Sequence, residues 1–143
     1  MKLGLASYQF RNKDIAFNLS QIEKAMQESQ GKVDLLCFGE SFLQGFDSLV
    51  WNYEIDKDMA ISQNSSVMDK LCNLTVQYKI DLLFGYVEKN GESIYSSCAV
   101  IEKGKIIHNY RRISKNWKEY DKTGSHYCEG FEAKKFSYGG KTL

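Results

Sequence analysis

The segment LLCFGESFLQGF, Leu35 to Phe46, joins a strand-like apolar run to an acidic residue. The apolar residues follow one another almost without alternation, which is typical of a strand covered on both faces. The run stops at Gly39, and Glu40 follows it among aromatic residues. In open α/β sheets, ligands bind beyond the carboxyl ends of the strands. Glu40 is therefore a candidate functional residue at the rim of a sheet.

The neighbours of Glu40 support a chemical role for it. We expect Phe38, Phe42 and Phe46 to remove water from the carboxylate and disfavour its charged form, as suits a general base. A solvated loop glutamate, or a carboxylate at the start of a helix, explains the same residue about as well.

The surrounding sequence alternates between strand and helix patterns. The expected elements are a strand over Leu3–Gln9, a helix from Asn12 or Asp14 to Gly31, a strand over Val33–Gly39, a helix from Asn64 or Ser65, and a strand over Ile80–Glu88. This order predicts a parallel core with right-handed crossovers. Turn signals at Asn90-Gly91, at Lys103-Gly104-Lys105 and at Gly139-Gly140 predict that a β-meander follows. Tyr86 and Glu88 would then follow the third strand, at the same rim as Glu40.

Charge and composition exclude several classes of function. The net charge of +1 predicts no general attraction to nucleic acid or to a membrane surface. No phosphate-binding or dinucleotide-binding glycine motif is present. The two histidines, His108 and His126, are far from clustered acids, so no metal and no cofactor are expected. The first residues are too polar for a signal peptide, and we expect a cytoplasmic location.

Two blocks of sequence, in this order, carry a resemblance to a known family. FGESFLQGF and FGYVEKNGESIYSSCAVIEKGKIIHNYRR resemble segments of the nitrilase, or carbon-nitrogen hydrolase, superfamily. Tyr95, Ser97 and Tyr110 match its pattern, whereas Ser96 stands where asparagine is common and Gly39 where many members have proline. The resemblance spans the chain and implies an α/β fold: half of a nitrilase-type α-β-β-α sandwich, with a β-α-β-α-β core followed by a β-meander.

The resemblance also implies a mechanism. In this superfamily a cysteine attacks the carbon of an amide or nitrile, a glutamate accepts the thiol proton, and a lysine stabilises the oxyanion. Glu40 matches the glutamate. Arg112 occupies the slot of the lysine, and Lys115 and Lys118 follow closely. We expect Lys118 to fill the role, with Arg112 as second choice, although both lysines could equally be solvated loop charges. Glu119 is a speculative match for a second glutamate.

The cysteine of that mechanism has no counterpart here. None of the four cysteines fits the pattern, and a pair of Cys128 with His126 is only a remote alternative. Residues 1–143 are therefore expected to form one truncated domain, the N-terminal half of a hydrolase, inactive alone and prone to self-association. The complete protein would act on a small amide or nitrile as a homo-oligomer. The alternative is a non-catalytic α/β fragment that serves as an interaction or vestigial module.

Overall fold

The computed structural model describes all 143 residues and contains one five-stranded sheet in the order β1-β2-β3-β4-β5. Its elements are β1 Leu3–Leu5, α1 Ile15–Ser29, β2 Leu35–Cys37, α2 Tyr53–Met59, α3 Ser66–Tyr78, β3 Asp81–Asn90, β4 Ser93–Glu102, β5 Lys105–Arg111, the 3₁₀ turn η1 Lys115–Trp117, β6 Ser137–Tyr138 and β7 Lys141–Thr142. The predicted class is confirmed: a mixed α/β sheet followed by a β-meander.

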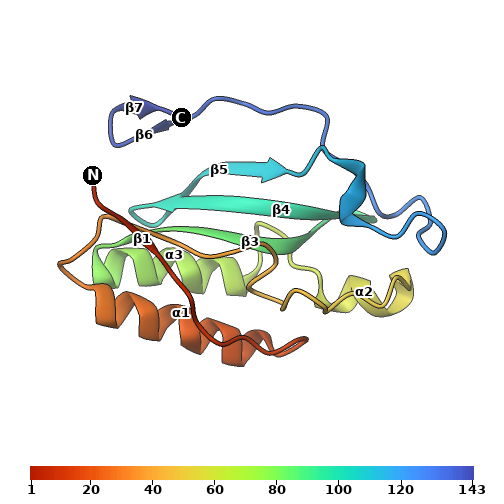
Figure 1. The fold of residues 1–143 in the computed structure, drawn as a ribbon, viewed down its shortest axis with the longest axis horizontal. Helices are drawn as coiled ribbons and strands as arrows, with labels where there is room; N and C mark the ends of the chain where they lie inside the picture. The colour runs from red at the N-terminus through yellow and green to blue at the C-terminus, as the bar shows by residue number, and fades with distance from the viewer.

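The first three strands are parallel neighbours, and two helical connections join them. Because both crossovers advance in the same direction across the sheet, right-handed connections place α1 and α3 on the same face. Figure 1 shows the two helices side by side below the sheet. Asp14 caps α1 by accepting a hydrogen bond from the Phe17 N–H, and Ser65 caps α3 by accepting one from the Met68 N–H. Asp14 and Ser65 are among the helix starts that the sequence predicts.

The main core lies between these helices and the sheet. α1 contributes Ile22, Ala25 and Met26, and α3 contributes Met68 and Leu71, all buried in one cluster. Apolar residues of β2, β3 and β4 complete the cluster from the sheet side, chiefly Leu36, Leu82, Phe84, Ala99 and Ile101. The hydrophobic spacing of the two helices therefore marks the faces that they bury.

Two tight turns convert the parallel sheet into a meander. β3 pairs antiparallel with β4, and β4 with β5. Gly91 lies in the first turn at φ +59°, and Lys103 and Gly104 lie in the second at φ 48° and φ 85°. The structure corrects one detail: β3 runs on to Asn90, so Tyr86 and Glu88 are buried within the strand instead of following it.

β1 is shorter than predicted. The sequence pattern extends to Gln9, but the pairing of β1 with β2 ends at Leu5 and Cys37. One further hydrogen bond, from the Ala6 N–H to the Cys37 carbonyl, closes the ladder. The strand ends there because β2 ends there and offers no further partner.

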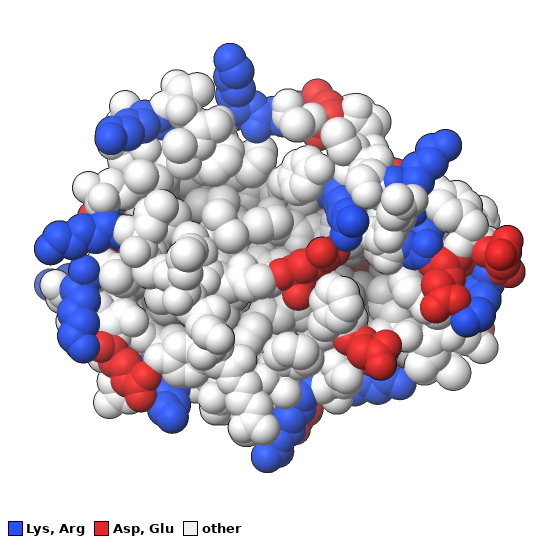
Figure 2. All heavy atoms as spheres, in the orientation of Figure 1, with Lys and Arg blue, Asp and Glu red and all other residues white.

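The sheet face opposite the helices is only partly covered. The chain after Gly130 crosses this side, and Figure 1 shows β6 and β7 above the sheet. Phe136 stacks on His108 with ring centroids 4.2 Å apart. At the free edge of the sheet, Leu3 and Leu5 are 53% and 86% exposed. Figure 2 shows that most charged side chains lie around the periphery of the view, and that one acidic and one basic group lie near its centre.

No helix in the structure combines the length and the apolar character that crossing a bilayer requires.

Candidate active site

Glu40 sits on a turn that is pressed against the backbone of β3. The Phe38 N–H donates to the Leu83 carbonyl at 2.8 Å, and the Gly85 N–H donates to the Gly39 carbonyl at 3.2 Å. A Cβ atom on Gly85 would lie only 2.6 Å from the Cα of Glu40. Glycine at position 85 therefore allows the turn to approach the strand closely, and the turn fixes where the carboxylate emerges.

The residue after Glu40 has an unusual backbone. Ser41 adopts φ 53°, in the left-handed region that few non-glycine residues occupy. Such conformations persist where the surrounding structure holds them, and they are common at functional sites. Here the close contact with Gly85 supplies that support.

Two side chains hold the Glu40 carboxylate. Arg112 Nη1 lies 2.5 Å from Glu40 Oε1, and the Ser96 hydroxyl donates to the same oxygen at 3.1 Å. The structure thus brings Glu40 together with Arg112, one of the two residues suggested above for the role of the catalytic cation. The expectation of a dry carboxylate is wrong: the Glu40 side chain is 44% exposed. Phe38 and Phe42 are buried in the main core, and Phe46 is itself exposed.

The carboxylate opens onto a cavity of about 240 Å³. Residues of β3, β4 and β5 line it, together with residues that directly follow β2 and β5. The lining residues are Phe38, Gly39, Glu40, Gly85, Ser96, Ser97, Cys98, Tyr110 and Arg112. Cys98 is a thiol in this lining, and burial raises its pKa to about 11. A thiol with so high a pKa is a poor nucleophile at neutral pH.

Lys118, the other nominated cation, has its own partners. Its ammonium group lies 3.0 Å from Glu129 and donates to the Tyr127 carbonyl, and the side chain is only 9% exposed. Hydrogen bonds from Tyr120 and Lys118 outweigh the opposing effect of burial and lower the pKa of Glu129. Lys118 therefore makes its contacts within the 118–129 segment and not with Glu40.

The remaining nominated residues lie apart from the cavity. Lys115 is exposed at the start of η1, and Glu119 pairs with Lys122 on the surface. His126 stacks on Tyr53 with ring centroids 3.6 Å apart, and its Nδ1 contacts the Glu92 carbonyl.

The structure does not join Cys128 to His126. The Cys128 thiol instead contacts the Ser125 carbonyl at 3.4 Å.

A buried group around Glu88 was not recognised in the sequence as a unit. Glu88 is 1% exposed and accepts hydrogen bonds from Arg111, Ser97, Asn109 and Gln63. These bonds outweigh the opposing effect of burial and lower the pKa of Glu88. The signal that could have revealed it is an acidic residue two positions after the buried Tyr86, with an arginine on β5, the second strand along the meander.

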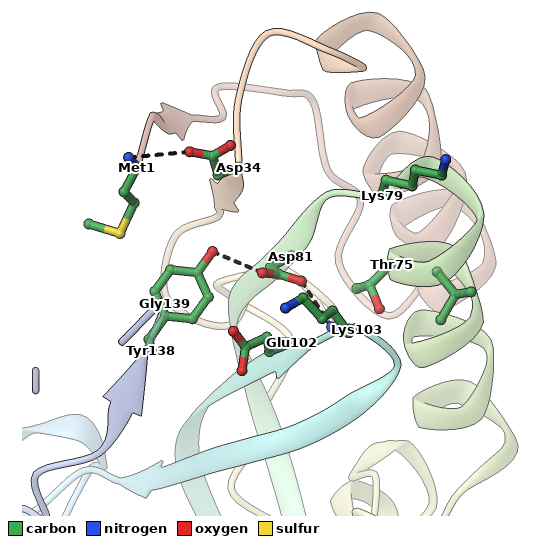
Figure 3. A pocket seen from close by; sticks show the side chains of 10 residues that line it. Met1, Asp34, Thr75, Lys79, Asp81, Glu102, Lys103, Tyr138 and Gly139 are labelled. Carbon is green, nitrogen blue, oxygen red and sulfur yellow. Dashed lines mark hydrogen bonds and ion pairs between the residues drawn. The ribbon is translucent and has the colours of Figure 1, made fainter. Parts of the chain in front are cut away.

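The largest cavity, about 710 Å³, lies at the other end of the sheet, near the starts of β2 and β3. Figure 3 shows Tyr138 reaching into it from β6 and donating a hydrogen bond to Asp81 at 2.9 Å. Asp34 is paired there with the Met1 amino group at 3.5 Å. No three His, Cys, Asp or Glu side chains of the structure are grouped as metal ligands. This cavity thus offers carboxylates that are largely engaged with the chain itself.

Comparison with known proteins identifies the family of the chain. The sequence model of the carbon-nitrogen hydrolase family matches residues 4–141. The chain is 26% identical over 109 residues to an arylacetonitrilase of Aspergillus niger. The aligned region covers 70% of this chain and 32% of that protein. The chain is also 25% identical over 112 residues to an (R)-stereoselective amidase of Pseudomonas sp, covering 78% and 39%.

Solved structures show the same fold. A CN-hydrolase superfamily protein from Xanthomonas campestris superposes with a TM-score of 0.79 at 16% identity, over 99% of this chain and 51% of that one. An amidase from Nesterenkonia sp. superposes with a TM-score of 0.75 at 18% identity, over 99% and 53%. The chain spans about a third of the length of the curated relatives and about half of the solved chains. With a family match that covers nearly all of its residues, this chain belongs to the carbon-nitrogen hydrolase family of the nitrilase superfamily.

Proposed function

We propose that the cavity beside Glu40 is part of an active site that hydrolyses non-peptide carbon–nitrogen bonds in small amides or nitriles. The observation that carries this proposal is the meeting of Glu40 and Arg112 at the cavity, at the carboxyl end of β2. Such an arrangement offers a proton acceptor and a fixed cation on the same wall, which are the two groups that thiol-dependent acyl transfer requires.

In the proposed reaction, Glu40 accepts the proton of a cysteine thiol, and the thiolate attacks the amide or nitrile carbon. Negative charge then develops on the substrate, and a positively charged side chain stabilises it. The proton then passes to the substrate nitrogen, which leaves as the C–N bond breaks, and water releases the acyl group from the sulfur. Arg112 is the better placed of the two nominated cations, because it touches Glu40 whereas Lys118 is engaged by Glu129. Arginine acts here by charge and hydrogen bonding alone, since its guanidinium does not release a proton in proteins.

The nucleophilic cysteine is assigned to a segment other than residues 1–143. Cys98 is the thiol that lines the cavity, and its raised pKa disfavours the thiolate. Support for a thiol mechanism in a similar fold comes from a variant of the Nesterenkonia amidase, whose structure shows acrylamide added to its active-site cysteine.

The test uses the longest protein that the coding DNA encodes around this chain, assayed on a panel of small amides and nitriles. Glu40→Gln should keep the fold and lower kcat/KM by about 10²–10⁴-fold, because the base is lost. Glu54→Gln is the matched control, since its exposed carboxylate pairs with Lys57 on α2 and does not line the cavity. Turnover unchanged by Glu40→Gln would refute the assigned role, and turnover absent from every version would favour the non-catalytic module.

A second pair of variants separates the two cations. Arg112→Gln should lower kcat by about 10²–10³-fold, as removal of an oxyanion-stabilising group does. Arg112→Lys keeps the charge and should retain much more turnover than Arg112→Gln. If Lys118→Gln abolishes turnover and Arg112→Gln does not, the assignment of the cation is reversed.

A further inference from the structure

Two groups, each of one glutamate, one serine and one arginine, lie on opposite faces of the sheet. Their serines are adjacent on β4, and their arginines are adjacent at the end of β5. The inner group, on the helix side, is Glu88, Ser97 and Arg111; the outer group, at the cavity, is Glu40, Ser96 and Arg112. Consecutive residues of a strand point to opposite faces, so the adjacent serines serve different carboxylates, and the adjacent arginines do too.

The inner group is fully engaged. Arg111 donates twice to Glu88, from Nη2 to Oε1 at 2.8 Å and from Nε to Oε2 at 3.0 Å. Ser97 donates to Oε2 at 2.6 Å and Asn109 at 2.9 Å. The Arg111 guanidinium also lies 4.2 Å from the ring centre of Tyr95. A two-point contact between arginine and carboxylate fixes the orientation of both side chains as well as their distance.

The main chain transmits this order to the next residue. The Arg112 N–H donates to the Ser96 carbonyl at 2.8 Å, and the Gly130 N–H donates to the Arg112 carbonyl at 2.9 Å. Gly130 also packs so tightly that a Cβ on it would lie 2.3 Å from the Arg111 carbonyl oxygen. The peptide groups on both sides of Arg112 are therefore held, and its side chain leaves the strand in a direction set by that backbone.

We propose that Glu88 is a positioning residue: by holding Arg111 on the inner face, it sets the direction in which Arg112 meets Glu40 on the outer face. Glu88 does not touch the cavity and acts only through Arg111 and the backbone. The catalytic consequence rests on the proposed function, whereas the coupling between the two arginines can be measured without any turnover.

The experiment follows the Arg112 guanidinium of the 143-residue chain by ¹⁵N NMR. A guanidinium held by a carboxylate rotates slowly about its Nε–Cζ bond and gives separate Nη signals, and a free one gives averaged signals. Loss of these signals in Arg112→Lys assigns them. Glu88→Gln keeps the size of the side chain but removes its charge, and it should merge the Nη signals of Arg112 in a protein that remains folded by circular dichroism.

The controls bracket the expected result. Glu40→Gln removes the direct carboxylate partner of Arg112 and should merge the same signals. Glu119→Gln breaks a surface pair on the same segment and should leave them separate. Separate Arg112 signals in folded Glu88→Gln, with the rotation rate of the parent, would overturn the proposal and leave Glu88 with a purely structural role.

A second variant covers a failure to fold. Glu88→Gln leaves the partly buried charge of Arg111 without its carboxylate partner, and an unpaired charge of this kind destabilises the fold. The double variant Glu88→Gln/Arg111→Gln leaves no such charge. Merged Arg112 signals in the folded double variant support the proposal, and unchanged signals overturn it. A loss of turnover with unchanged signals would count against Glu88 as a positioning residue while leaving the proposed function standing.

Discussion

Replacing Gly85 with alanine should push the Glu40 turn away from β3. The added methyl group would lie 2.6 Å from both the Cα of Glu40 and the N of Ser41, and 2.8 Å from the Gly39 carbonyl oxygen. All three atoms belong to the backbone, so no flexible side chain can yield, and the turn must move by about 0.8 Å to restore a 3.4 Å contact. Overpacking of this kind costs about 1–3 kcal/mol of unfolding free energy, or about 3–9 °C in Tm for a chain of this length.

The adjacent glycine provides a matched control. A Cβ on Gly39 would meet no atom within 4 Å, so Gly39→Ala should change the unfolding free energy by no more than about 0.5 kcal/mol. Urea unfolding followed by tryptophan fluorescence measures both variants, and the Nη signals of Arg112 report whether the Glu40 pair survives. If Gly85→Ala unfolds within about 0.5 kcal/mol of Gly39→Ala, the close approach of turn and strand is refuted.

Three further predictions concern buried polar groups. Hydrogen bonds hold the pKa of Glu88 below its ordinary 4.5, so the contribution of Glu88 to stability is present above about pH 4.5 and is lost as the pH falls below that value. The unfolding free energy measured across this pH range should therefore fall less steeply in Glu88→Gln than in the parent protein. Tyr127→Phe removes the hydroxyl that donates to the buried Asp56 at 2.6 Å and should cost about 1–3 kcal/mol in urea unfolding, whereas the exposed Tyr120→Phe should cost much less. With a pKa of about 11 against an ordinary 9.0, Cys98 carries about 100-fold less thiolate at pH 8, and mass spectrometry should show it alkylated at least tenfold more slowly than in the unfolded chain.

The helix starts and hairpins of the fold could be read from the sequence because their causes are local. Asp14 and Ser65 cap the two long helices with their own side chains, a few residues from the groups they bind. Gly91 and Gly104 supply left-handed backbone in the two turns of the meander. The sequence pattern predicts too short a β3, because a glutamate after an apolar run usually marks the end of a strand. Glu88 stays inside the sheet through partners on other strands, which no local pattern displays.

The candidate site was predictable in position but not in partnership. The end of the apolar run located Glu40, and the resemblance supplied Arg112 and Lys118 as cations. The structure pairs Lys118 with Glu129 because that carboxylate lies in the same segment and both groups are shielded from water. Glu40 is exposed because only Phe38, of the three aromatic residues around it in sequence, lines the cavity beside it. Phe42 is buried in the main core, and Phe46 is itself 71% exposed.

The adjacent arginines illustrate how one stretch of sequence can hold two separate sites. Read along the chain, Arg111-Arg112 is a run of positive charge, and such runs are usually solvated. Read across the sheet, the two side chains take opposite faces, and each meets its own glutamate. The two ion pairs differ in environment: Glu88 is buried and fixed by four side chains, whereas Glu40 is half-exposed and open to a cavity. A single peptide group joins the arginine of the rigid buried pair to the arginine of the accessible pair. Through that peptide group the buried pair can set the geometry of the exposed pair, and it is the exposed pair that a substrate can reach.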